Sequence, residues 1–85
     1  MADYTSFVDI IDAFESPTDM AEAMPYFEKL GRVYPSNINT WKNRDSIPAQ
    51  FFVSVVLASR TRRITGINER VLAVIAQSRK EAANG

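Results

Sequence analysis

Four prolines interrupt this 85-residue chain and restrict where its helices begin and end. Proline lacks the backbone N–H that a helix interior uses, but it fits the first turn of a helix. Residues 16–19 therefore predict a helix start, because Ser16 can cap, Pro17 follows it, and Asp19 meets the positive end of the helix dipole. We expect the other three prolines to mark a second helix start, a turn and a third helix start, in the order Pro25, Pro35 and Pro48.

Apolar residues at helical spacing predict an all-α fold, a compact bundle of about five helices. We expect a first helix from Ser6 to about Glu15, and a short helix from Pro25 that ends at Gly31 and buries Tyr26, Phe27 and Leu30. Two further helices are expected over about 48–60 and from Asn68 to about 82, with residues 1–5 and 83–85 as flexible tails. The folded unit, 6–82, is a single domain.

Composition narrows the classes of function. The chain contains no cysteine and no histidine, which excludes disulfides, a thiolate nucleophile and the usual zinc sites. There is no glycine-rich phosphate loop and no acid pair in an apolar context, so we expect neither an enzyme nor a cofactor nor a small-molecule substrate. No apolar run approaches the roughly 20 residues of a membrane span, and no signal peptide is evident, so a cytoplasmic location is expected.

Charge is balanced overall but unevenly placed. Residues 1–28 hold seven acidic residues and no basic one, whereas 29–85 hold ten basic and three acidic residues. If the two parts occupy different sides of the fold, the basic side attracts phosphate and the acidic side faces away or meets a partner. The alternative is solvated charge with no partner.

The stretch 35–44 carries the clearest functional pattern. Ile38 and Trp41, three residues apart, predict a helix over 36–44 that buries one face and is capped by Ser36. Its other residues are hydrogen-bonding or basic, and asparagine pairs with adenine while lysine and arginine suit guanine or phosphate. We interpret it as the recognition helix of a small DNA-binding domain. The predicted contacts are Ser36, Asn37, Asn39, Thr40, Lys42, Asn43 and Arg44.

A second basic patch occupies residues 60–63. Its charges either complement the dipole of the preceding helix or clamp the DNA backbone, and both roles are compatible. Arg62 and Arg63 are the candidates for the clamp. The helix over 48–60 is apolar almost all round, which favours burial on more than one side, including against a second subunit. The predicted dimerisation residues are Phe52, Val55, Val56, Val71, Val74 and Ile75.

Together these stretches resemble the helix-turn-helix domains of small Cro-like and repressor proteins of temperate phages and bacterial prophage-like elements. The resemblance covers roughly residues 7–76 and rests on FVDIIDAF (7–14), INTWKNR (38–44), SIPA (46–49), RITGI (63–67) and VLA (71–73). It implies a transcriptional regulator, most simply a repressor, that reads the major groove as a homodimer. It also implies that Trp41 is mainly structural and that Lys42 and Arg44 hold phosphates.

One feature departs from the family pattern. About seven more residues than usual separate the segment Met20-Ala21-Glu22-Ala23 from Trp41, so that 24–30 either extends the second helix or forms an extra one. A protein-interaction module that keeps this scaffold without reading DNA is the alternative function. The acidic first 28 residues favour it, with the segment around Pro25 as the docking element.

Overall fold

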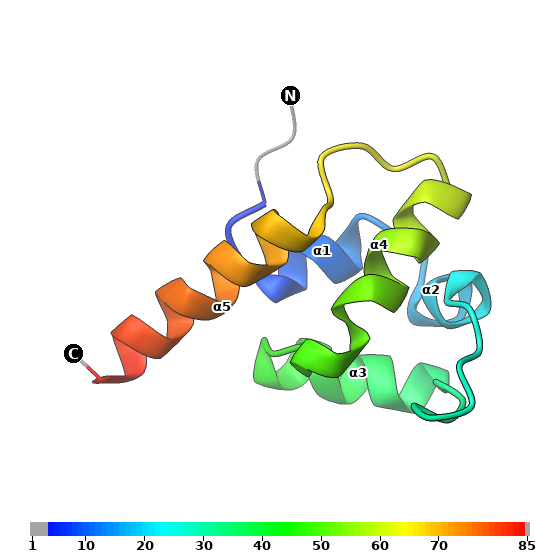
Figure 1. Cartoon of the computed structure of the whole chain (residues 1–85), viewed down its shortest axis with the longest axis horizontal. Coiled ribbons are helices and arrows are strands. Elements are labelled where there is room, and N and C mark those ends of the chain that lie inside the picture. The colour runs from blue at the N-terminus through cyan, green and yellow to red at the C-terminus, as the bar shows by residue number, and fades with distance from the viewer. Residues whose placement is uncertain (1–3, 85) are drawn as a thin grey trace.

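A computed structural model describes residues 4–84, and helices dominate its secondary structure. In chain order, the elements are α1 (Phe7–Asp12), α2 (Pro17–Ala23), α3 (Pro35–Arg44), a 3-10 turn η1 (Ala49–Phe51), α4 (Phe52–Thr61) and α5 (Glu69–Asn84) (Figure 1). No strand is present among the described residues, so the prediction of a compact, mostly helical fold is confirmed.

Three of the predicted helix starts are confirmed by their caps. The Ser6 hydroxyl accepts from the Asp9 N–H at 3.1 Å, and the Ser16 hydroxyl accepts from the Asp19 N–H at 3.0 Å. The Asn68 side-chain oxygen accepts from the N–H of Val71 at 2.9 Å. Each cap satisfies a backbone donor that has no partner within its own helix.

The predicted cap of α3 was wrong by two residues. The helix begins at Pro35, and Tyr34 occupies the cap position that we had assigned to Ser36. Proline suits the first helical position because its missing N–H would have no partner there. The Tyr34 N–H donates to the Asn37 side-chain oxygen at 2.9 Å, so Asn37 closes the first turn from inside the helix.

The predicted helix from Pro25 to Gly31 does not exist. Residues 24–34 form an irregular loop, here called the 24–34 loop, in which the Phe27 carbonyl accepts from the N–H groups of Leu30 and Gly31 at 3.0 and 2.9 Å. Met24, which precedes the proline, is extended with ψ 127°. The residue before a proline disfavours helical geometry, which ends α2 at Ala23. A single turn closed by the Phe27 carbonyl is all that follows between Pro25 and Gly31.

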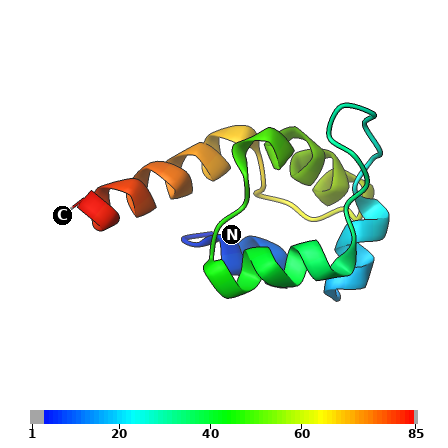
Figure 2. The same ribbon diagram turned by 90° about the horizontal axis from the view of Figure 1, so that it is seen from below.

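Each α-helix contributes at least one completely buried side chain to the core. They include Ile10, Met20, Ile38, Val55 and Leu72, each 0% exposed. Aromatic contacts close the core around them, with the rings of Trp41 and Phe51 5.1 Å apart and those of Phe7 and Phe52 6.0 Å apart. The assignment of Trp41 to the core is therefore confirmed. Figure 2 shows α1 and α3 along one side of the molecule and α4 and α5 along the other.

The predicted dimerisation surface needs correction. Val55, Val56 and Ile75 are buried within the monomer, and its own core already covers them. Phe52 and Val71 are half-buried, and Val74 is 59% exposed. The apolar pattern of α4 and α5 therefore reflects packing inside one chain. Beyond its packed first half, α5 extends away from the other helices (Figure 1).

Within residues 4–84, no helix combines the length and apolar character needed to cross a membrane.

Candidate nucleic-acid interface

Helix α3 presents a continuous stripe of uncharged polar side chains. Ile38 and Trp41 are its buried residues, and both point into the core. At 100° per residue, the direction opposite to them is occupied by four exposed residues spaced i, i+3, i+4 and i+7. This outward stripe consists of Ser36, Asn39, Thr40 and Asn43. Helix α3 itself lies along an edge of the molecule in both views (Figures 1 and 2).

Two of the predicted contact residues are partly engaged within α3. The Asn37 oxygen is occupied by the Tyr34 N–H, and its helical position places it beside the stripe rather than on it. The Thr40 hydroxyl donates to the Ser36 carbonyl at 3.0 Å, which leaves its oxygen lone pairs as acceptors. Asn39 and Asn43 are exposed, and they lie one helical turn apart.

Ion pairs engage two of the basic side chains predicted to hold phosphate. Lys42 Nζ lies 2.7 Å from Asp12 Oδ1 of α1, and Arg62 Nε lies 2.9 Å from Asp19 Oδ1 of α2. Both pairs join the acidic part of the chain to its basic part, so the predicted separation of charge is partly cancelled. The Lys42–Asp12 pair is exposed and contributes little to stability, so Lys42 can exchange its partner for a phosphate at small cost.

Arg62 and Arg63 do not join the α3 stripe. They follow the C-terminal end of α4, which lies beside α2 at the upper right of Figure 1, whereas α3 forms the lower edge. Arg63 has a left-handed backbone, with φ 58°, in the turn that leaves the helix. The basic patch at 60–63 and the outward stripe therefore occupy different faces. The candidates for the backbone clamp thus lie apart from the residues predicted to read bases.

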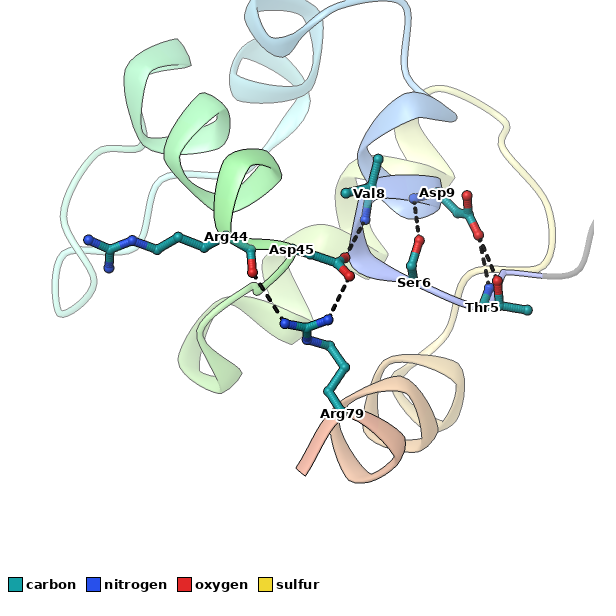
Figure 3. A network of polar contacts seen from close by, with 7 residues as sticks. All are labelled: Thr5, Ser6, Val8, Asp9, Arg44, Asp45 and Arg79. Atoms are coloured by element: carbon teal, nitrogen blue, oxygen red, sulfur yellow. Dashed lines mark hydrogen bonds and ion pairs between the residues drawn. The ribbon is translucent and has the colours of Figure 1, made fainter. Parts of the chain in front are cut away.

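Asp45 fixes the position of α3 in the fold (Figure 3). Its Oδ1 accepts from the Val8 N–H in the first turn of α1 at 3.0 Å, and its Oδ2 accepts from Arg79 Nη1 of α5 at 2.7 Å. The second terminal nitrogen of Arg79 donates to the Arg44 carbonyl at the end of α3, at 3.3 Å. One carboxylate thus joins three helices, and we did not expect it because its partners lie 37 and 34 residues away.

A smaller network holds the residues before α1. The Thr5 backbone N–H and hydroxyl donate to Asp9 Oδ2 at 3.1 and 3.0 Å (Figure 3). These bonds hold the pKa of the Asp9 carboxyl below its ordinary value, because they favour the charged form. The Tyr4 hydroxyl donates to the Thr65 carbonyl at 3.1 Å, so Tyr4 and Thr5, which we had placed in a flexible tail, both make contacts.

A groove of about 390 Å³ separates α2 from the 24–34 loop. Its lining is mostly apolar, with Ala21, Met24 and Val33 in the walls and Tyr26 and Tyr34 on the rim. Both tyrosines are exposed, at 64% and 56%. The extra length between α2 and α3 was the sequence signal for an unusual element here, although we had assigned it to helix.

The described residues hold no cluster of three or more acidic side chains that is arranged for a metal ion. Comparison of the chain with protein-family models, with curated proteins and with solved structures found no match.

Proposed function

We propose that the protein is a sequence-specific double-stranded DNA-binding regulator of transcription, of the phage or prophage repressor type, that acts in the bacterial cytoplasm. The observation that carries the proposal is the outward stripe of α3. Its side chains are uncharged amides and hydroxyls, they are exposed, and they take no part in the core. Asparagine offers a donor and an acceptor together, which matches the major-groove edge of adenine.

The size of the stripe sets the length of the site. From Ser36 to Asn43 the helix rises about 10 Å at 1.5 Å per residue, which spans about three base-pair steps of 3.4 Å. Three or four base pairs are too few for specificity, and two copies on half-sites one helical turn apart would supply the remainder. We therefore propose a homodimer on DNA. Among the predicted dimerisation residues, Val74 on α5 is the most accessible candidate, at 59% exposed.

The test is selection of a binding site from a random duplex pool, followed by fluorescence-anisotropy titration of the selected duplex and a shuffled copy at two salt concentrations. We expect tighter binding to the selected site and weaker binding as salt rises. A selected site with two-fold symmetry would support the homodimer.

Asn39→Ala separates reading from folding. Alanine favours helix and leaves Ile38 and Trp41 in place, so the circular dichroism spectrum is expected to persist. Discrimination between the selected and shuffled duplexes is expected to fall by about 1–3 kcal/mol for a lost bidentate contact. Thr65→Ala, at an exposed position between α4 and α5, is the control and is expected to change nothing. Unaltered discrimination in Asn39→Ala and in Asn43→Ala would remove α3 as the reading element.

The groove beside α2 favours a second candidate function, a protein-interaction module. Its exposed tyrosines and apolar walls are typical of surfaces that receive another protein. This candidate predicts no duplex binding even at low salt, and a partner whose affinity falls in Tyr26→Ala. Specific duplex binding by the wild-type protein would leave it without support.

A further inference from the structure

The 24–34 loop and α3 share one edge of the molecule. The loop leads directly into the first turn of α3, and its lower part lies along the same lower edge in Figure 1. Residues 24–44 contain four basic residues and a single acidic one, whereas residues 1–23 contain six acidic residues and no basic one. Basic residues therefore outnumber acidic ones in the loop and α3 taken together.

Two of those basic residues belong to the loop and are exposed, namely Lys29 and Arg32. Neither forms an ion pair with another described residue, in contrast to Lys42. They flank Gly31, whose φ of 76° supports the turn. The exposed residues Tyr26 and Tyr34 lie in the same loop, and tyrosine hydroxyls can donate to phosphate oxygens.

The dimensions of the DNA major groove indicate which part of the DNA this loop would contact. The major groove is about 12 Å wide, and a helix with its side chains occupies about 10–12 Å of it. A chain that continues from the end of such a helix must pass the wall of the groove, which is the phosphate backbone. With α3 in the groove, the 24–34 loop passes this wall at the N-terminal end of the helix.

We infer that the 24–34 loop is a second DNA-contacting element, in which Lys29 and Arg32 bind the phosphates flanking the base pairs that α3 reads. The inference rests on the proposed function. Because phosphate contacts carry no sequence information, the loop supplies affinity and register, while α3 supplies discrimination. Glu28 reduces the net charge of the loop to +1. The loop therefore acts through two local phosphate contacts and not through a long-range electrostatic field.

The experiment measures the salt dependence of binding for the wild type and for Lys29→Ala/Arg32→Ala on the selected duplex and on its shuffled copy. Each lost phosphate contact reduces the steepness of log affinity against log salt concentration by about 0.9. Per contact, the gain in affinity between 1 M and 0.1 M salt is then about eightfold smaller. We expect a slope smaller by about 2, an equal loss on both duplexes, and unchanged discrimination between them.

Arg70→Ala is the matched control, since Arg70 is an exposed arginine at the start of α5, away from the lower edge. It is expected to keep the wild-type slope. Arg32→Lys keeps the charge and is expected to retain most of the affinity, and thermal unfolding of each variant verifies the fold.

Three results decide the matter. A reduced slope in the double variant alone supports the inference. Wild-type binding with the same slope in the double variant and in Arg70→Ala overturns it and leaves the proposed function intact. A wild-type protein that binds no duplex at low salt overturns both and assigns the loop and its groove to a protein partner.

Discussion

Replacement of Asp45 by alanine removes three structural contributions at once. The carboxylate accepts the Val8 N–H at 3.0 Å and pairs with Arg79 at 2.7 Å. The backbone of Asp45 is left-handed, with φ 50° and ψ 49°, at the C-terminal cap of α3. Aspartate tolerates this conformation better than alanine does, because its short polar side chain can hydrogen-bond locally. The variant therefore loses a cap, an ion pair and a suitable backbone.

These contributions differ in size. Loss of the acceptor for the Val8 N–H resembles loss of a helix cap, about 1 kcal/mol. Alanine in the left-handed region costs about 1 kcal/mol more. The ion pair contributes at most about 0.5 kcal/mol, since the side chains of Arg79 and Asp45 are 43% and 30% exposed and solvent screens them. The free energy of unfolding is thus expected to fall by about 2–3 kcal/mol, which lowers Tm by roughly 10–20 °C in a domain of this size.

Urea denaturation followed by circular dichroism tests this division, with Asp45→Gly and Arg79→Ala as comparisons. Glycine accepts the left-handed backbone, so Asp45→Gly is expected to lose less stability than Asp45→Ala. Arg79→Ala removes the ion pair and the long, exposed bond to the Arg44 carbonyl but leaves the Val8 bond, and it is expected to cost about 0.5–1 kcal/mol. Equal losses in Arg79→Ala and Asp45→Ala would refute the reasoning, because the ion pair would then dominate. A loss below about 0.5 kcal/mol in Asp45→Ala would show that the network does not stabilise the fold.

Two further predictions concern stability. Gly31→Ala is expected to lower the free energy of unfolding by about 1 kcal/mol through the left-handed backbone alone, since nothing lies within 4 Å of the added Cβ. The urea midpoint should fall with an unchanged m value, and an unshifted midpoint would contradict the prediction. Asp9 has a lowered pKa in the folded state, so its contribution is present above the unfolded pKa and is lost as pH falls through the folded value. Asp9→Asn is therefore expected to flatten the decline of Tm between about pH 5 and pH 2, whereas parallel curves would assign that decline to other carboxylates.

The features that the sequence determined by itself are local. The caps of Ser6, Ser16 and Asn68 each bridge three residues, so a single turn of helix contains both partners. The burial of Ile38 and Trp41 follows equally from helical spacing, and with it the outward direction of the polar residues on α3. Such features depend on a helix of known period and need no knowledge of the neighbouring elements.

The 24–34 loop shows where local reasoning failed. The spacing of its aromatic residues was compatible with a short helix, but spacing alone does not show whether the backbone hydrogen bonds of a helix form. Tertiary context decided that the loop passes over α2 with its tyrosines exposed. Lys29 consequently lies in an irregular loop instead of the short helix that we had expected, and Arg32, expected in the turn after that helix, belongs to the same loop.

Only the tertiary structure decided which surfaces cover one another. Periodicity indicates that Val55 and Ile75 must be covered, but it does not distinguish the monomer's own core from a second subunit, because both remove the same apolar area from water. Charges behave similarly. Neither Lys42 nor Asp45 carries any local sign of its partner, and both partners come from helices that are distant in the sequence. Long-range pairing depends on how the helices pack, and a short sequence pattern contains no record of that packing.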